Sequence, residues 1–450
     1  MKYEQATEIL RQNGQEHLLR FWKTLGKAEQ KSLLEQIESI DFREVARCRA
    51  MLPGAGKPAA SKKGVPTAPK VTVLKGALLK KAVAAGEREL AAGRVGVLLV
   101  AGGQGSRLGF DGPKGAYPIG PISNEPLFYF HARKVLALSR RYGASIPFYI
   151  MTSMANYADT VAHFEEHGFY GLDKKDVIFF RQGMWPGMTD DGKIILDKPG
   201  HVFMSPDGHG GMLAALKANG CFEDMAKRGV KTLFYFQVDN PLVNVAEPAF
   251  VGLHVLEKSE YSLKLCAKRN PREGLGMVVR RGRGFDMIEY TEMTREMNYR
   301  KTADGDLYFK YGSPAIHVFD REFLEREAKK DMPLHLAHKK IATVDDAGKT
   351  VVHDTANGYK FEKFIFDILP DAKRVTLLAF DRRDEFAPVK NAEGSDSPQT
   401  CRDALRAKWR RQLAGDLHIM VPSAMPLEID PLYMYDGSDI LKRGFLLQKD

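Results

Sequence analysis

The sequence predicts an α/β protein with a mainly parallel, mixed sheet and helices on both of its faces. From residue 95 onward, apolar runs typical of strands alternate with segments of helical periodicity, as βαβ units require. The run 95–100 reads VGVLLV and has the unbroken apolar character of a strand buried on both faces. A glycine-rich turn follows it directly, at the edge where open α/β sheets bind ligands.

Four regions are expected along the chain. Residues 1–51 carry apolar residues at helical spacing and are predicted to form two or three amphipathic helices. Residues 52–70 are rich in Pro, Gly, Ala, Ser and Lys and are expected to be a flexible basic linker. The main α/β domain is predicted over residues 71–390. A small C-terminal α+β domain is predicted over residues 391–450, with a basic helix and short strands near 427–435.

The elements of the main domain follow from local periodicity and from turn residues. Helical spacing predicts helices at 74–92, 127–142, 154–168 and 211–218. Apolar or alternating runs predict strands at 95–100, 146–152, 177–181, 232–238, 262–267, 277–280, 285–290 and 374–380.

Composition excludes several classes of protein. No apolar run is long enough to span a bilayer, and the first residues, MKYEQATEILRQ, lack the apolar core of a secretory signal. We therefore expect no membrane partner and a cytoplasmic location. The 4 cysteines are scattered without a C-x-x-C pair, which favours reduced thiols over a zinc site or a disulfide framework.

The formal net charge of +10 is largely local. No Asp or Glu occurs between Val45 and Gly86, whereas this stretch holds nine Lys and Arg residues. The rest of the chain is nearly balanced and shows no basic stripe interleaved with aromatic residues. A solvated tether explains the basic stretch better than a nucleic-acid interface does, so we expect no nucleic-acid partner.

The turn after residues 95–100 has the composition of a phosphate-binding loop. Glycines 102, 103 and 105 allow a sharp turn that presents backbone N–H groups, and Arg107 and Lys114 flank it. A P-loop would need G-x-x-x-x-G-K-[ST], which is absent. A dinucleotide fingerprint would need a glycine three residues after Gly105, where Leu108 stands.

The loop resembles G-G-x-G-[ST]-R-L-G-x(n)-P-K, the signature of sugar-nucleotide pyrophosphorylases. Along nearly its whole length the chain is similar to eukaryotic-type UTP-dependent sugar-1-phosphate uridylyltransferases, above all to their UDP-N-acetylglucosamine branch. The strings that carry this resemblance are YIMTS, VIFFRQGMWPGM, DGKIILDKPGHVFMSPDGHGG, QVDNPLV, EKFIFD and DEFAPVKNAEG.

The resemblance implies a Rossmann-like, GT-A-like nucleotidyltransferase fold. It implies that UTP and a hexose 1-phosphate react to give a UDP-sugar and pyrophosphate, with Mg²⁺ as cofactor and Mn²⁺ as a substitute. We expect a monomer or a weak homo-oligomer. An alternative of another class is a catalytically idle homologue that binds or senses UDP-sugars. The chain keeps all of the charged residues that the reaction needs, which argues against it: Arg107, Lys114, Asp239, Lys363 and Lys390.

The resemblance assigns roles residue by residue. Arg107 and Lys114 are the expected catalytic residues, since a bidentate guanidinium and a mobile ammonium suit the phosphates of UTP. Asp239, at the end of an apolar strand, is the expected Mg²⁺ ligand. The residues expected to bind UTP are Ala101, Gly102, Gly103, Gly105, Gln182, Gly208 and Lys363. Those expected to bind the sugar phosphate are His209, Glu289, Tyr290, Ser313 and Lys390.

Three positions depart from the acetylglucosamine-using pattern. His209 stands where PDGNGG has asparagine, as in glucose-type and broad UDP-sugar pyrophosphorylases. The segment A-G-N-I-A-N-H reads YGSPAIH here, so Ser313 and Ile316 replace two asparagines. Whole-chain resemblance favours N-acetylglucosamine 1-phosphate, whereas these positions favour glucose or galactose 1-phosphate. Both stay open, with a slight preference for broad use.

No residue assigned by the resemblance lies before Val95. Removal of residues 1 to about 70 is therefore expected to leave the sugar-nucleotide site chemically intact.

Overall fold

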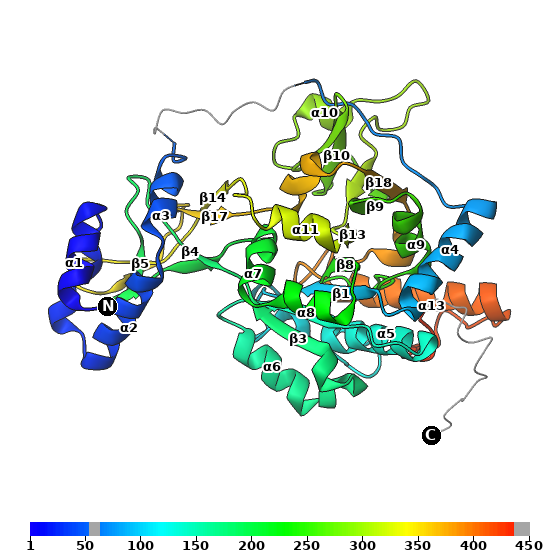
Figure 1. Ribbon diagram of the computed structural model, residues 1–450, viewed down its shortest axis with the longest axis horizontal. Coiled ribbons are helices and arrows are strands. Elements are labelled where there is room, and N and C mark those ends of the chain that lie inside the picture. The colour runs from blue at the N-terminus through cyan, green and yellow to red at the C-terminus, as the bar shows by residue number, and fades with distance from the viewer. Residues whose placement is uncertain (54–63, 436–450) are drawn as a thin grey trace. The chain divides into compact units, whose positions relative to one another are not determined.

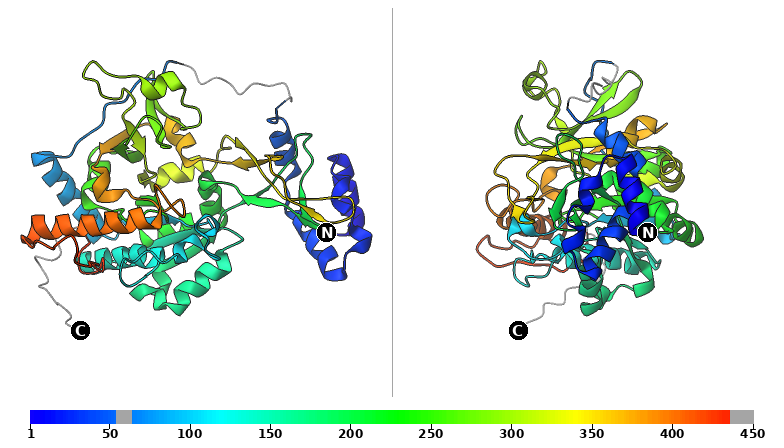
Figure 2. Two further views of the ribbon diagram at one scale, coloured as in Figure 1. Left: turned by 180° about the vertical axis from the view of Figure 1, so that it is seen from behind. Right: turned by 90° about the vertical axis from the view of Figure 1, so that its left-hand side faces the viewer.

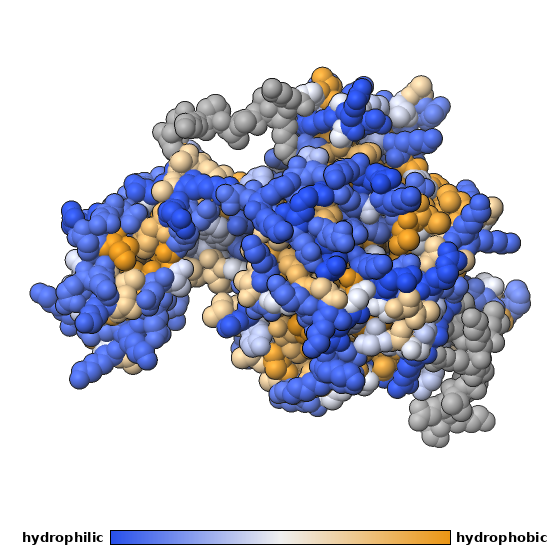
Figure 3. Space-filling view, viewed as in Figure 1, coloured by the Kyte–Doolittle hydropathy of each residue, from blue (hydrophilic) through white to orange (hydrophobic). Residues whose placement is uncertain are grey.

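The computed structural model describes residues 1–53 and 64–435 (Figure 1). These residues form two compact units, each assembled from separate stretches of chain. Unit 1 contains residues 1–53, 182–212 and 331–367. Unit 2 contains residues 64–181, 213–330 and 368–435. In the view of Figure 3 the visible surface of each unit is mainly hydrophilic, as expected where the apolar residues lie in internal cores.

The helices of unit 2 are α4 (Gly76–Ala91), α5 (Leu127–Tyr142), α6 (Tyr157–Glu166), α7 (Met212–Ala218, starting at the unit boundary), α8 (Cys221–Arg228), α9 (Pro248–Leu256), α10 (Arg295–Tyr299), α11 (Arg321–Glu327), α12 (Arg382–Glu385) and α13 (Pro398–Leu417). Its strands are β1 (Val95–Val100), β2 (Phe148–Thr152), β3 (Val177–Arg181), β8 (Thr232–Gln237), β9 (Tyr261–Ala267), β10 (Gly276–Arg281), β11 (Gly284–Ile288), β12 (Tyr311–Ser313), β13 (His317–Asp320) and β18 (Val375–Ala379).

These strands form one mixed sheet of 10 strands. Its order is β11-β10-β12-β9-β13-β8-β1-β2-β3, and β18 pairs with β9. Strands β8, β1, β2 and β3 are mutually parallel, so their carboxyl ends share one edge. Beyond β8 the direction changes, because β13 pairs antiparallel with both β8 and β9. The predicted α/β fold with a mixed sheet is confirmed.

Helices cover both faces of the sheet, as predicted. Val97 and Leu99 of β1 join a core that includes residues of α4, α5, α9 and α13. On the other face, the Tyr149 hydroxyl of β2 donates to Asp224 of α8 at 2.8 Å. Figures 1 and 2 both show α5 and α13 side by side, and the rings of Phe130 and Trp409 lie 6.4 Å apart between them.

Two glycines allow α4 and α9 to touch through their backbones. A Cβ atom on Gly86 would lie 1.9 Å from the carbonyl oxygen of Pro248, and one on Gly252 would lie 1.7 Å from that of Ala82. Neither distance is possible for a real side chain, so the close packing of these helices requires glycine at both positions.

Unit 1 combines the N-terminal helices with short strands from later in the chain. Its helices are α1 (Tyr3–Gln12), α2 (Lys27–Ser39) and α3 (Phe42–Arg49). Its strands are β4 (Met184–Pro186), β5 (Leu196–Lys198), β6 (His201–Val202), β7 (Met204–Pro206), β14 (His335–Lys339), β15 (Thr343–Val344), β16 (Thr350–Val351) and β17 (Gly358–Glu362). They pair as β4 with β7, β5 with β6, β14 with β17 and β15 with β16, all antiparallel.

One hydrophobic core spans these pieces. Leu18 and Leu33 of the N-terminal region are buried with Trp185, Val202 and Phe361 from the strands. This shared core speaks against the expectation that removal of residues 1 to about 70 leaves the sugar-nucleotide site chemically intact, although none of the expected site residues lies in that stretch. The N-terminal helices complete the core of the strands that lead to Gln182, Gly208 and Lys363.

The domain boundaries expected from the sequence also differ from the units observed. Residues 182–212 and 331–367 leave the main domain to join the N-terminal helices. Helix α13 packs on the core of unit 2 through Leu405 and Trp409, so residues 391–435 are part of that unit rather than a separate domain. The strands expected near 427–435 are wrong, since that segment has no strand. Most of the expected linker, residues 54–63, lies outside the described residues.

Removal of residues 1–52 should destabilise unit 1, because it uncovers Trp185, Val202 and Phe361. Fully burying one side chain of this kind contributes about 1.5–3 kcal/mol, so the loss for three of them is comparable with the whole stability of an ordinary domain. We expect a lower melting temperature and loss of UTP binding by calorimetry. A truncated protein that melts and binds UTP like the full chain would show that the strands need no helical cover.

Candidate active site

The glycine-rich loop after β1 is closed by its own backbone. Gly105 N–H donates to the Gly112 carbonyl at 2.9 Å, and Lys114 N–H donates to the Gly103 carbonyl at 3.1 Å. Gly105 has no room for a side chain, since a Cβ there would lie 2.7 Å from the Phe110 ring. The loop thus has a defined shape at the carboxyl end of β1, with Gly102 and Gly103 accessible to solvent.

A buried asparagine that was not identified from the sequence clamps this loop. Asn156 donates from Nδ2 to the carbonyls of Ala101, at 2.8 Å, and Gly103, at 3.2 Å. Its Oδ1 accepts from Ser153 N–H at 2.8 Å. The clamp crosses from the β2–α6 connection to the β1 loop. The only sequence signal is a polar residue shortly after a strand that parallels β1.

Four charged groups meet where β1 and β8 end. Lys114 and Asp239 are half-buried, as is Lys390, and Arg107 is exposed. Burial lowers the pKa of Lys114, with Lys390 and Arg107 acting in the same direction and Asp239 opposing it. In the part of the chain that the structure describes, none of these three cations has a carboxylate within ion-pair distance. The site therefore carries unmatched positive charge.

The loop that carries Lys390 lies against the loop that carries Asp239. Val389 N–H donates to the Asp239 carbonyl at 2.8 Å. Beneath this contact, Glu385 and Lys264 form a buried ion pair. Neither residue was singled out in the sequence, because a lysine and a glutamate 121 positions apart give no local signal.

Three residues expected at the sugar lie on the antiparallel part of the sheet. Ser313 pairs with Gly276 across β12 and β10, and the Glu289 carboxylate lies close to the same glycine. Tyr290 follows with 54% of its surface exposed. Ser313 of β12 and Glu289, which directly follows β11, therefore lie on either side of Gly276 of β10. In contrast, Ile316 is 1% exposed and packs in the core, so it cannot line a pocket.

The remaining predicted residues lie together in unit 1. Gln182, which is 7% exposed, precedes Gly183, whose carbonyl accepts from Asp207 N–H at 3.1 Å. The Asp207 carbonyl accepts in turn from Lys363 N–H at 2.7 Å. Gly208 has φ +82°, and a Cβ there would lie 2.5 Å from the Lys363 carbonyl oxygen. The structure thus joins three distant segments that were expected to bind UTP.

His209 is engaged by its own unit. Its Nδ1 accepts from Ile365 N–H at 3.1 Å, and its ring stacks on Phe364 with centroids 5.3 Å apart. Burial lowers the pKa of His209 to about 4, so the ring is neutral near pH 7.

Asp207 is a further residue that sequence reasoning missed. The residue is 4% exposed, and its Oδ1 is buried without a hydrogen-bond partner. Glycines 183 and 211 lie so close to the carboxylate that neither could carry a side chain. Burial raises the pKa of Asp207 to about 7, and Lys363 opposes this rise. A carboxyl group held this way is available to a hydrogen-bonding ligand.

The donor set suits Mg²⁺ better than a metal held by the protein alone. No group of three or more His, Cys, Asp or Glu residues gathers at one point within residues 1–53 and 64–435. Asp239 offers a half-buried carboxylate beside the cationic cluster. A single carboxylate that shares an ion with phosphates and water is the arrangement Mg²⁺ prefers.

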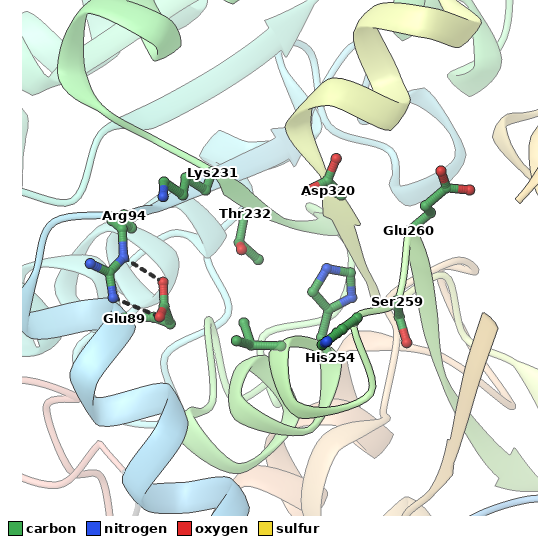
Figure 4. A pocket seen from close by; sticks show the side chains of 10 residues that line it. Glu89, Arg94, Lys231, Thr232, His254, Ser259, Glu260 and Asp320 are labelled. Carbon is green, nitrogen blue, oxygen red and sulfur yellow. Dashed lines mark hydrogen bonds and ion pairs between the residues drawn. The ribbon is translucent and has the colours of Figure 1, made fainter. Parts of the chain in front are cut away.

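A cavity of roughly 560 Å³ lies elsewhere in unit 2 (Figure 4). Arg94 and Thr232 line it at the amino ends of β1 and β8, the edge opposite the glycine-rich loop. The Arg94–Glu89 ion pair at 2.7 Å and the His254 imidazole also face it. None of the predicted site residues lines this cavity, so it plays no part in the arrangement above.

Among the helices that the structure describes, none combines the length and the apolar run needed to cross a membrane.

Comparison with known proteins gives consistent matches. A family model described as UTP–glucose-1-phosphate uridylyltransferase matches residues 57–397. UDP-N-acetylglucosamine diphosphorylase 2 of Arabidopsis thaliana is 35% identical over 97% of this chain and 91% of its own length. UDP-N-acetylglucosamine pyrophosphorylase of Saccharomyces cerevisiae is 33% identical over 95% of this chain and 94% of its own length. A crystal structure of the uridine diphosphate N-acetylglucosamine pyrophosphorylase from Trypanosoma brucei matches with a TM-score of 0.83 and 27% identity, covering 98% of this chain and 94% of that one.

Proposed function

The chain belongs to the UTP–glucose-1-phosphate uridylyltransferase family, and we propose that it makes UDP-N-acetylglucosamine from UTP and N-acetylglucosamine 1-phosphate. It is a nucleotidyltransferase of the uridylyl-transferring class. The observation that carries the proposed site is the cluster of Lys114, Arg107 and Lys390 around Asp239, where two parallel strands end. Cations without protein partners are what a site for two phosphorylated substrates needs.

The reaction needs positioning and charge stabilisation rather than a general base. An oxygen of the sugar 1-phosphate, already ionised at neutral pH, attacks the α-phosphorus of UTP. The bond from that phosphorus to the bridging oxygen breaks, and pyrophosphate leaves. Exposed Arg107 grips the β- and γ-phosphates, and half-buried Lys114 stabilises charge on the α-phosphate. Lys390 holds the sugar phosphate.

Mg²⁺ would be held by Asp239 together with phosphate oxygens, and Mn²⁺ would serve in its place. When bound it neutralises charge on the UTP phosphates. The backbone of Asp239, which would hold the ion through its carboxylate, is fixed by the hydrogen bond from Val389 N–H to the Asp239 carbonyl.

Uridine recognition falls to unit 1. The Gln182 amide offers a donor and an acceptor to the uracil edge. Gly208 leaves the backbone bare beside Lys363, so that the base and ribose can approach closely. The accessible backbone of Gly102 and Gly103 contacts the phosphates of UTP, whereas the N–H groups of Ala101 and Gly105 are bonded to the carbonyls of Met151 and Gly112 and shape the loop.

Similarity over the whole chain supports N-acetylglucosamine 1-phosphate as the acceptor. Two of the three departures from the acetylglucosamine pattern are weaker evidence for an unacetylated sugar than the sequence suggested, because Ile316 is in the core and His209 is bonded to Ile365. Ser313 remains evidence for an unacetylated sugar, because its hydroxyl reaches less far toward an acetamido group than the amide of asparagine would. It supports an unacetylated hexose 1-phosphate as a second candidate, with Glu289 and Tyr290 at the sugar hydroxyls in either case.

Replacement of Lys114 or Arg107 by alanine should lower turnover by at least about a hundredfold, because each loss removes charge stabilisation from the transition state. Pyrophosphate release measures it, and circular dichroism checks the fold. Arg140→Ala, an exposed arginine at the end of α5, is the matched control. Normal rates in either variant would contradict its role, and no turnover in the wild type would indicate an idle homologue.

Activity should require Mg²⁺ or Mn²⁺, and Asp239→Asn should raise the concentration for half-activation by about tenfold or more, since it removes the charged ligand. A metal titration of the steady-state rate tests this, with exposed Asp304→Asn as control. Full activity in excess chelator would refute the metal assignment.

A panel of sugar 1-phosphates should give a kcat/KM for N-acetylglucosamine 1-phosphate at least about tenfold above that for glucose 1-phosphate. Ser313→Asn should increase this preference further, because it supplies an amide to the acetamido group. Exposed Ser32→Asn should leave the ratio unchanged. Equal use of both sugars would favour the second candidate, and an unchanged ratio in Ser313→Asn would show that residue 313 does not contact the acetamido group.

A further inference from the structure

The loops that carry Asp239 and Lys390 are joined by a side chain from one of them. Asn240 is 3% exposed, and its Nδ2 donates to the Glu385 carbonyl at 2.7 Å. Its Oδ1 accepts from Ala387 N–H at 3.2 Å. Together with the bond from Val389 to Asp239, these contacts bind residues 385–389 to the end of β8.

The Glu385 side chain also joins the same two loops. One oxygen of its carboxylate accepts from Asn244 N–H at 3.2 Å. The other meets the ammonium of Lys264, a β9 residue with no exposed surface. The same ammonium also bonds Glu247 at 2.5 Å. One buried ammonium thus bonds two carboxylates within one cluster.

Two further buried lysines hold the carbonyls that follow Asp239. Lys408 of α13 donates to the Leu242 carbonyl at 2.8 Å and to Asn244 Oδ1 at 2.6 Å. Lys134 of α5 donates to the Val243 carbonyl at 2.8 Å and to that of Pro241. Helices α5 and α13 therefore both fix the irregular backbone that follows Asp239.

A buried ion pair of this kind is weak evidence for stability, because the cost of desolvating both charges rivals their attraction. A buried ion pair can instead serve to hold the surrounding loops in one specific geometry. The cluster lies directly under the two residues to which the proposed function gives the metal and the sugar phosphate.

We propose that Asn240 and Glu385, with Lys264 beneath them, are positioning residues that fix the Asp239 carboxylate relative to the Lys390 ammonium. This inference rests on the proposed function. The carboxylate that would hold the metal and the ammonium that would hold the acceptor phosphate are kept at a fixed separation by one hydrogen-bonded unit, which would align the attacking oxygen with the α-phosphorus.

The test is a double-mutant cycle in the full-length protein. In the wild-type background Asn240→Ala should raise the KM for the sugar 1-phosphate by roughly tenfold and also raise the half-activating Mg²⁺ concentration. In a Lys390→Ala background the same change should raise that KM by less than about threefold, because Lys390 is no longer there to be misplaced. UTP affinity measured without metal should not change.

The matched control is Asn357→Ala. Asn357 makes the same double clamp in unit 1, donating to the Ile341 carbonyl at 2.9 Å and accepting from Ile341 N–H at 2.8 Å. Its effect should be additive with Lys390→Ala. Additive effects of Asn240→Ala as well would overturn the proposal and leave the clamp a purely structural feature.

Failure of the proposed function gives a different result. If Lys390→Ala alone leaves the KM for the sugar 1-phosphate and the turnover unchanged, the role of Lys390 is wrong whatever Asn240 does. If Asn240→Ala does not fold, the cycle is run with Glu385→Gln/Lys264→Met, which removes both charges together. Coupling of that pair with Lys390→Ala supports the proposal, and additivity overturns it.

Discussion

The constraint on which this site depends is repulsion among cations that the protein leaves unmatched. Lys390 and Arg107 both lie near enough to Lys114 to lower its pKa, and Asp239 is the nearby carboxylate that opposes them. Partly excluded from water, such charges repel more strongly than on an open surface. The chain could relieve this repulsion by relaxing its loops, and the surrounding structure prevents that. Phosphate groups then supply the missing negative charge.

The interactions that hold the loops in place differ between the site itself and the layer beneath it. The loops that bear the charges are clamped by neutral amides, Asn156 on one and Asn240 on the other. A neutral clamp adds rigidity without supplying a counter-ion that would compete with substrate. Charged clamps appear one layer further in, where Lys264 and Lys408 find carboxylates and carbonyls of their own. Polar networks that are fully satisfied in this way rigidify a structure.

What the sequence predicts well is the part set by short-range patterns. Residues 95–100 and 177–181 form strands with the expected bounds, because a buried strand needs an unbroken apolar run. The strands of unit 1 were missed, since Met184–Pro186 pairs with Met204–Pro206 across a segment rich in glycine. Such short pieces acquire their structure from distant partners.

The strands wrongly predicted near residues 427–435 have a different explanation. Leu432 and Met434 are buried and Tyr433 is exposed, so the alternation typical of a strand is real. The buried residues pack on the helical layer of the main core instead of in a sheet. Asn156 and Asn240 show the same limit at the site. A buried amide is recognised as a clamp only when the carbonyls that it bridges are known.

The scattered composition of unit 1 bears on how the chain folds during synthesis. Gln15 bonds to Gly192 and Ile194, 177 and 179 positions later, and Leu18 shares a core with Phe361. The N-terminal helices therefore emerge from the ribosome long before the residues that bury their apolar faces. Contacts of such high sequence separation form slowly, and exposed apolar helices invite aggregation in the interval. These helices are therefore made well before the residues that cover them and are among the last parts of the chain to reach their final environment.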